Sequence, residues 1–139
     1  MSIQFALGPL FAQVLLVFIV MLLMAKERRT AIYRGDVHPR DIALREPKWP
    51  TKALQVANNF SNQFEIPVLF YVVTIIALIT RQADLLFVFL SWIFVALRYI
   101  HAFIHTTSNR VTYRSIVFGL GVLIVLALWI KLALQIYLQ

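Results

Sequence analysis

Hydrophobic residues fall into four long stretches, separated by shorter segments in which polar residues dominate. The stretches cover about residues 3–25, 53–80, 84–106 and 113–138. Each is close to the ~20 residues that a helix needs to cross a ~30 Å hydrocarbon core. The pattern predicts an all-α integral membrane protein, a bundle of four transmembrane helices forming a single domain over residues 1–139. The first stretch lacks a basic start and a small-residue cleavage site before Lys26, so we expect a retained helix and not a signal peptide.

The composition agrees with contact between the chain and lipid. Hydrophobic residues make up 61% of the 139 positions and charged residues 14%, and the mean hydropathy is +0.81. Soluble domains have about 45–50% apolar residues. The sequence contains no cysteine, which excludes disulfides, zinc–thiolate sites and a thiol nucleophile supplied by the protein.

Positive charge is concentrated around the long connection of residues 26–52. Eight basic residues lie in or beside it: Lys26, Arg28, Arg29, Arg34, Arg40, Arg45, Lys48 and Lys52. By the positive-inside rule this connection is cytoplasmic, which places both termini outside, in what we expect to be a bacterial inner membrane. The net charge of +7 is then explained by topology and by attraction to anionic lipid headgroups. We predict no nucleic-acid partner.

The second hydrophobic stretch carries polar residues at helical spacing. Gln55, Asn58, Asn62 and Glu65 recur at intervals of three, four and three, which places them on one face of a helix in its cytoplasmic half. Ionisable residues inside a membrane are costly and usually functional. Pro67 lacks the backbone donor for the carbonyl of Gln63, so it loosens the helix beside this face. A kink here would open a pocket.

The third and fourth stretches bring further polar groups to the same membrane level. On the third, Arg98, His101 and His105 fall at i, i+3 and i+7, and the fourth opens with Arg110, Tyr113, Arg114 and Ser115. We expect these groups to converge near the cytoplasmic face. Two histidines at i and i+4 without an acidic third ligand make a weak metal site, and we predict no metal.

These polar residues have a structural and a functional interpretation. Glu65 pairing with Arg98 would lock the bundle together without any ligand. However, one carboxylate then faces three arginines, including Arg110 and Arg114, so the predicted site has a positive surplus. Because buried charges need compensation, an anionic ligand with several carboxylates would balance it. Arginine matches carboxylates by bidentate geometry.

The order of these motifs resembles that of the MAPEG superfamily, the membrane-associated proteins in eicosanoid and glutathione metabolism, in a bacterial-type form. The resemblance lies in the segment from Asn62 to Phe70, in Arg98-Tyr-Ile-His101-Ala-Phe-Ile-His105, and in Arg110-Val-Thr-Tyr-Arg114-Ser115. It covers about half of the chain, residues 53–119. The first helix and the basic loop agree only in kind.

The resemblance implies a homotrimer that binds glutathione between subunits near the cytoplasmic face, with a lipophilic small-molecule substrate arriving from the bilayer. Asn62 and Glu65 would hold amino and amide groups of the tripeptide, and Arg98 with Arg110 its carboxylates. Arg114 and Ser115 would lie at the thiol as catalytic residues. Asn58, His101 and His105 complete the predicted glutathione-binding set.

Three positions depart from the pattern of the glutathione-using members. Those members often have tyrosine where this chain has His105 and Phe118, and arginine where it has Asn58.

Our main hypothesis is a glutathione-dependent transferase or peroxidase acting on lipophilic electrophiles or lipid hydroperoxides. The alternatives are a non-catalytic lipid-binding or scaffold protein of the same fold and, less favoured, a small proton-coupled exporter. Exporters of that kind carry a glutamate in the first helix, where this chain has only Gln4 and Gln13 as notable polar residues.

Overall fold

The computed structural model describes residues 3–44 and 48–138. These residues form five α-helices and one short 3₁₀-helix, and no strand: α1 (Ile3–Tyr33), η1 (Pro39–Ile42), α2 (Thr51–Asn62), α3 (Ile66–Ile79), α4 (Leu85–Thr106) and α5 (Val111–Tyr137). Helices α2 and α3 together make one span. Four spans are long and apolar enough to cross a membrane, which confirms the predicted fold class.

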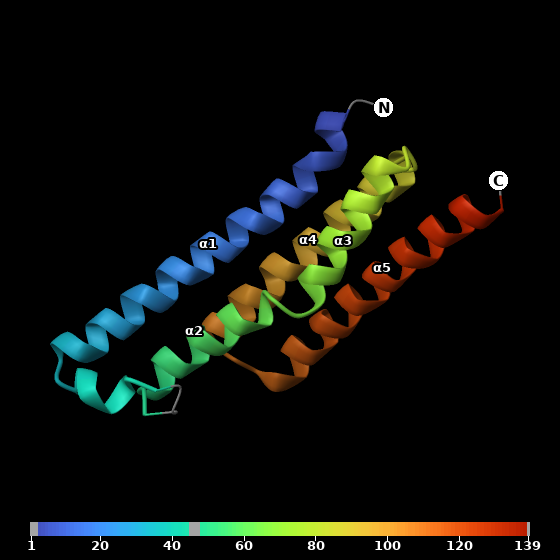
Figure 1. Cartoon of the computed structure of the whole chain (residues 1–139). Coiled ribbons are helices and arrows are strands. Elements are labelled where there is room, and N and C mark those ends of the chain that lie inside the picture. Colours follow the sequence, from blue (N-terminus) through green and yellow to red (C-terminus); the bar gives the residue numbers. More distant parts are fainter. Residues whose placement is uncertain (1–2, 45–47, 139) are drawn as a thin grey trace.

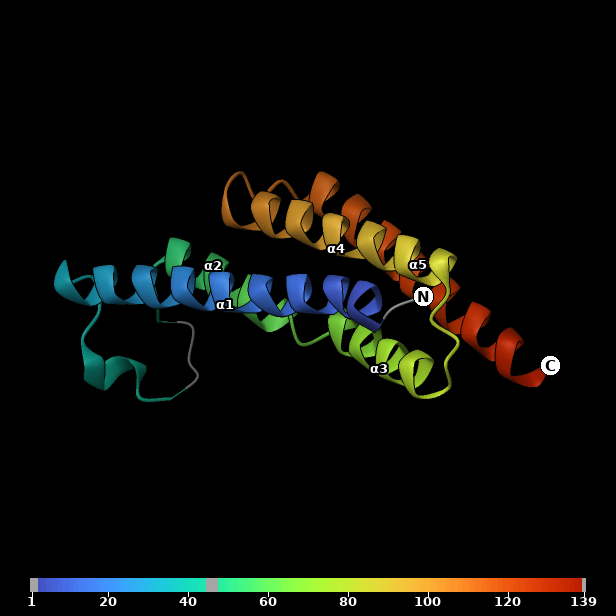
Figure 2. The same ribbon diagram turned by 90° about the horizontal axis from the view of Figure 1, so that it is seen from above.

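The spans alternate in direction and lie alongside one another (Figures 1 and 2). Both termini and the turn between α3 and α4 lie at one end of the molecule. The segment that contains η1 and the connection between α4 and α5 lie at the opposite end. This end carries the polar residues of the predicted site, and we refer to it as the basic end because eight of the 13 lysines and arginines lie in or beside residues 26–52.

Helix α1 does not end with its apolar stretch at residue 25; it continues through the basic segment to Tyr33. The added residues include good helix formers such as alanine, lysine, glutamate and arginine, and they extend the helix by about 12 Å. Gly35, with a φ of 75°, ends it. The N–H groups of Gly35 and Asp36 donate to the carbonyls of Ile32 and Ala31, which is a Schellman motif. Arg45, counted above in the basic loop, lies outside the described residues.

The second span is broken, and the break falls where Pro67 predicts a loosened helix. Helix α2 ends at Asn62 and α3 begins at Ile66. The N–H groups of Gln63, Phe64 and Glu65 donate three residues back, to Phe60, Ser61 and Asn62. They do not form the four-residue bonds of an α-helix. The break therefore interrupts the span beside Asn62 and Glu65.

The spans bury a narrow core and expose wide apolar faces. Phe70, Phe94 and Leu128 are fully buried between α3, α4 and α5. Only 22% to 44% of the most apolar part of each span is buried. The exposed face of α5 is lined by large apolar side chains: Ile116, Leu120, Leu123, Leu126, Ile130 and Leu134. Such a surface is suited to hydrocarbon and not to water.

Asp84 ties the beginning of α4 to the end of α5. Its carboxylate accepts a hydrogen bond from the N–H of Phe87 at 2.9 Å, capping α4. It also pairs with Lys131 at 2.6 Å and accepts from Gln135 at 3.1 Å. Partial burial works against ionisation, but the bonds from Lys131, Phe87 and Gln135 and the charge of Lys131 outweigh it and hold the pKa of Asp84 below its usual value.

Candidate functional site

A cavity of about 310 Å³ near the basic end collects polar side chains from three helices. Its lining residues are Asn62, Glu65, His101, His105, Arg114, Ser115 and Phe118. Six of these were predicted from the sequence, and Phe118 was recognised there only as a departure from the family pattern. The break after α2 places Glu65 beside the C-terminal half of α4 and the first turns of α5.

Asn62 connects a buried cation to an exposed carboxylate. The Arg98 guanidinium donates from one Nη atom to the Asn62 side-chain oxygen at 2.8 Å and to the Asn62 carbonyl at 3.3 Å. The Asn62 amide nitrogen donates to Glu65 at 2.8 Å. The amide is therefore fixed in one orientation, with its oxygen towards the cation and its nitrogen towards the carboxylate. Arg98 and Glu65 interact through Asn62 and not by direct contact.

Three predicted site residues do not line the cavity. Arg98 is only 2% exposed and lies behind Asn62. Asn58 and Arg110 are exposed on α2 and just before α5. The cavity wall thus carries one carboxylate and one guanidinium, from Glu65 and Arg114. The additional positive charge predicted from the sequence therefore does not line the cavity, because Arg98 lies behind the wall and Arg110 beside it. Helix periodicity predicts the face of the helix on which a residue lies, but not the direction in which its long side chain turns.

The two histidines lie side by side on α4. Their ring centroids are 5.6 Å apart, with an angle of 82° between the planes, and the ring of His101 also contacts Phe118 at 5.8 Å. His101 is 3% exposed and His105 7%. The Nδ1 atom of each ring is buried without a hydrogen-bond partner. The Nε2 atoms are not among these buried, unpartnered atoms, and both residues line the cavity.

Asn109 positions Arg114, and the sequence reasoning missed it. Its backbone has a φ of 50°, a conformation that asparagine tolerates better than most residues. Its side-chain oxygen accepts a hydrogen bond from Arg114. A cation in the first turn of a helix is unfavourable because the N-terminus of the helix dipole is positive. Asn109 therefore holds the Arg114 guanidinium at a position where the dipole of α5 disfavours a positive charge.

The C-terminus of α4 is held by side chains from α2. Gln55 donates to the carbonyl of His105 at 2.7 Å and to that of Thr107 at 3.2 Å, and Lys52 donates to the carbonyl of Thr106. These carbonyls have no partner within the helix. Gln55, predicted to share the polar face of Asn62 and Glu65, thus fixes the end of α4 beside His105.

A second polar face of α2 is fully buried, and the sequence reasoning did not select it. Gln63 donates to the side chain of Asn59 at 3.1 Å and accepts from Gln13 of α1 at 3.2 Å, while Asn59 donates to the carbonyl of Ala102 at 3.4 Å. The spacing of four between Asn59 and Gln63 was a signal for this face. The contacts join α1, α2 and α4 next to the cavity.

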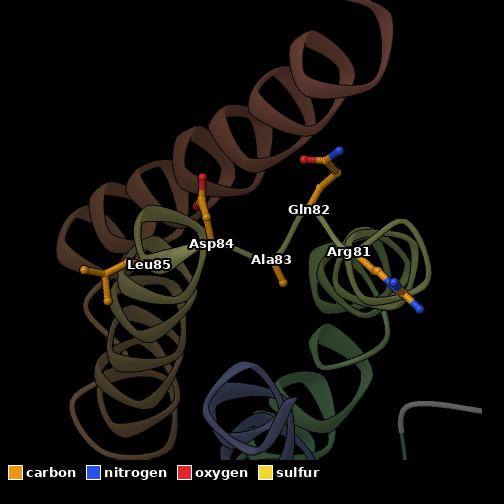
Figure 3. Close-up of a pocket in the computed structure, with 5 residues that line it drawn as sticks. All are labelled: Arg81, Gln82, Ala83, Asp84 and Leu85. Atoms are coloured by element: carbon orange, nitrogen blue, oxygen red, sulfur yellow. The ribbon is translucent and has the colours of Figure 1, made fainter. Parts of the chain in front are cut away.

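A larger hollow, of about 500 Å³, lies at the opposite end of the molecule (Figure 3). It is lined by residues 81–84 of the turn between α3 and α4 and by Leu85, the first residue of α4. In Figure 3 the side chains of Arg81 and Leu85 point away from each other. Converging polar groups mark a binding site better than size does, so the cavity at the basic end is the stronger candidate.

The comparison with known protein families decides the classification. A model of the MAPEG family matches residues 6–134. The chain belongs to the MAPEG family. This confirms the resemblance inferred from the motifs and extends it to α1 and the basic loop. No curated protein and no solved structure matches this MAPEG protein significantly. It is an integral, multi-pass membrane protein with four spans.

Proposed function

We propose that this MAPEG protein is a glutathione-dependent membrane transferase or peroxidase acting on lipophilic electrophiles or lipid hydroperoxides. The observation that carries the proposal is the convergence of Glu65, from the break between α2 and α3, with Arg114 and Ser115 of α5 on one cavity inside the basic half of the bundle. Membership of the family agrees, since MAPEG proteins work with glutathione in general.

The donors and acceptors of the cavity fit glutathione. The Glu65 carboxylate is suited to the ammonium group of the tripeptide, and it is held in place by Asn62 at 2.8 Å. Arg114 and Ser115 are suited to the sulfur, because a guanidinium and a hydroxyl donor favour a thiolate over a thiol. The absence of cysteine from the chain means that the nucleophilic sulfur has to come with the ligand.

The roles of the other arginines follow from their positions. Arg98 acts through Asn62, whose amide it holds, and is a positioning residue. Arg110 is exposed beside the cavity and is available to a ligand carboxylate there or to the cavity of a neighbouring copy. The chemical step thus depends most on Arg114, with Asn109 directing its guanidinium.

We propose further that the protein is a homotrimer in which the cavities are closed by neighbouring subunits, with the basic end facing the cytoplasm. Asn58 and Ser61 on α2, with Glu65 just after it, form an exposed polar face inside a segment long and apolar enough to span a membrane. Polar groups that face lipid are costly, so this face is suited to a protein partner. The apolar face of α5 is suited to lipid.

Replacement of Arg114 by alanine tests the catalytic assignment. Purified wild-type protein in detergent should bind glutathione at millimolar concentration and conjugate chlorodinitrobenzene or reduce a lipid hydroperoxide. In Arg114→Ala we expect kcat to fall by about 100-fold or more, because one preorganised donor at a developing charge contributes about that much. Arg81→Ala, an exposed arginine at the other end, serves as the matched control. Calorimetry that detects no glutathione binding to the wild type would refute the proposed function.

A lipid-binding or scaffold role is the second candidate, and a groove on the outside of the bundle favours it. The groove has a volume of about 490 Å³ and is lined almost entirely by apolar side chains of α1, α2, α3 and the break between α2 and α3: Leu10, Val14, Val17, Phe18, Met21, Phe60, Phe64, Tyr71 and Ile75. It is suited to an acyl chain. Native mass spectrometry that finds copurified lipid, together with an absence of glutathione-dependent turnover, would favour this role over the enzyme.

A further inference from the structure

The side-by-side histidines are among the few polar groups of the cavity that have no partner in the protein. His101 and His105 make no hydrogen bond through their side chains within the described residues, whereas Asn62, Glu65 and Arg114 are all engaged. Both imidazoles are more than nine-tenths buried and line the cavity. Two buried, unpartnered rings at the wall of a cavity need an atom of a bound water or ligand to complete their hydrogen bonding.

The buried edges of the rings indicate where their protons lie. A proton on Nδ1 would be a buried donor without an acceptor, which costs about 1–3 kcal/mol, and orphaned N–H groups are rarer than orphaned acceptors. The proton of a neutral imidazole is therefore placed on Nε2, and because both residues line the cavity, this nitrogen is the one available to a ligand. The charged groups around the pair are Arg98 on α4, Arg114 on α5 and Glu65 after α2. The rings thus present two neutral N–H donors to a ligand.

We propose that His101 and His105 form an oxyanion site for the second substrate, which selects electrophiles that place negative charge on oxygen when sulfur attacks, such as α,β-unsaturated ketones. This assignment rests on the proposed function and moves both histidines from the glutathione set to the acceptor. The contact between His101 and Phe118 places an apolar ring beside the donors, where the hydrocarbon part of the acceptor would pack.

The proposed step is a conjugate addition without oxidation or reduction. The glutathione thiol loses its proton to solvent, and the sulfur lone pair forms a bond to the β-carbon of the enone. The carbon–carbon π electrons move to give an enolate, whose oxygen accepts hydrogen bonds from the two Nε2–H groups. Water then protonates the α-carbon. The imidazoles stay neutral and act by donating hydrogen bonds, which stabilise the transition state more than the ground state.

Two aromatic electrophiles, compared as second substrates, distinguish an oxyanion role of the histidines from a general effect on turnover. Attack on benzylideneacetone produces an enolate oxygen, whereas attack on benzyl chloride displaces chloride and places no charge on oxygen. In His101→Phe and His105→Phe we expect the ratio of kcat/KM for the ketone to that for the chloride to fall about tenfold or more. His105→Gln, whose amide nitrogen lies near the position of Nε2, should recover part of the ratio. His38→Phe changes the exposed third histidine and is the matched control.

A binding measurement without glutathione gives a second readout. Para-nitrophenol absorbs visible light only as the phenolate, so donors at an oxyanion site raise the coloured fraction of the bound dye. The wild type and His38→Phe should both show this rise near neutral pH, and both phenylalanine variants of the pair should lose most of it. Circular dichroism of all the variants checks that the helices remain folded.

The outcomes separate this inference from the proposed function. If the wild type binds no glutathione but ionises the dye through the histidines, the proposed function fails while the anion site remains. If His101→Phe and His105→Phe lower turnover of both acceptors equally, or abolish glutathione binding, the histidines serve the tripeptide and the inference is overturned. An unchanged ratio with an unchanged dye spectrum overturns it as well.

Discussion

At the scale of single residues, Asn62 determines whether a cation can remain inside the span. Its side-chain oxygen accepts from Arg98 at 2.8 Å, and without it the guanidinium keeps only the longer bond to the Asn62 carbonyl. We expect Asn62→Leu to lower the free energy of unfolding by about 1–3 kcal/mol, since it leaves a buried charged donor poorly paired. The double variant with Arg98→Met should lose less than the sum of the single variants. Thermal unfolding in detergent measures this coupling, and energies that add within about 0.5 kcal/mol would contradict it.

Sequence reasoning at this scale found which residues share the site but not how their side chains turn. Helical spacing and motif order selected six of the residues that line the cavity. They could not show that Arg98 points to Asn62, nor that Asn109 holds Arg114, because long side chains reach several positions from one backbone site. The partners of a charge become visible only when the helices are packed.

At the scale of elements, Asp84 combines a helix cap with an ion pair, and two substitutions separate them. Asp84→Asn keeps a capping side chain and removes the charge that pairs with Lys131. Because the Asp84 side chain is about half exposed, we expect Asp84→Asn to lose less than about 1 kcal/mol of stability. Asp84→Ala also removes the cap, which costs about 1 kcal/mol more. Thermal unfolding of both variants in detergent gives the difference, and equal losses would show that the cap contributes nothing.

The same carboxylate predicts a pH dependence. Its pKa is lower in the folded protein than its usual value, so its stabilising contribution is present above the unfolded pKa of about 3.9. The contribution is lost as the pH falls through the folded value. The difference in stability between the wild type and Asp84→Asn should therefore shrink between pH 5 and about pH 3. A difference that stays constant over that range would exclude a role for the charge.

The elements themselves were predicted well from hydrophobic lengths and from Pro67, apart from the helical extension of α1. Hydropathy marks where a helix leaves lipid, at Lys26, but not where its hydrogen bonds stop. That point is set by Gly35, which adopts a positive φ of 75°. Helix propensity in the basic segment was the available signal.

At the scale of the whole molecule, the uneven polarity of the outer faces predicts how copies associate. The exposed residues of α2 are polar, whereas those of α5 after Ser115 are mostly apolar. For the proposed homotrimer, native mass spectrometry should give a species with three times the chain mass of 16.1 kDa. We expect Ser61→Trp on α2 to break the trimer and to weaken glutathione binding, whereas Leu126→Trp on α5 should leave the trimer intact. A Ser61→Trp trimer with full glutathione affinity would place the contact elsewhere.

The break between α2 and α3 has a consequence for amide hydrogen exchange. A helix in lipid normally protects its central amides for long times, because opening it would expose unpaired backbone groups to hydrocarbon. Here the amides of Gln63, Phe64 and Glu65 are held only by three-residue turns, next to a cavity with a polar wall. A short, fast-exchanging window should therefore appear inside the second span, with slow exchange before and after it. Solvent would then reach the interior of the bundle beside the cavity proposed to bind glutathione.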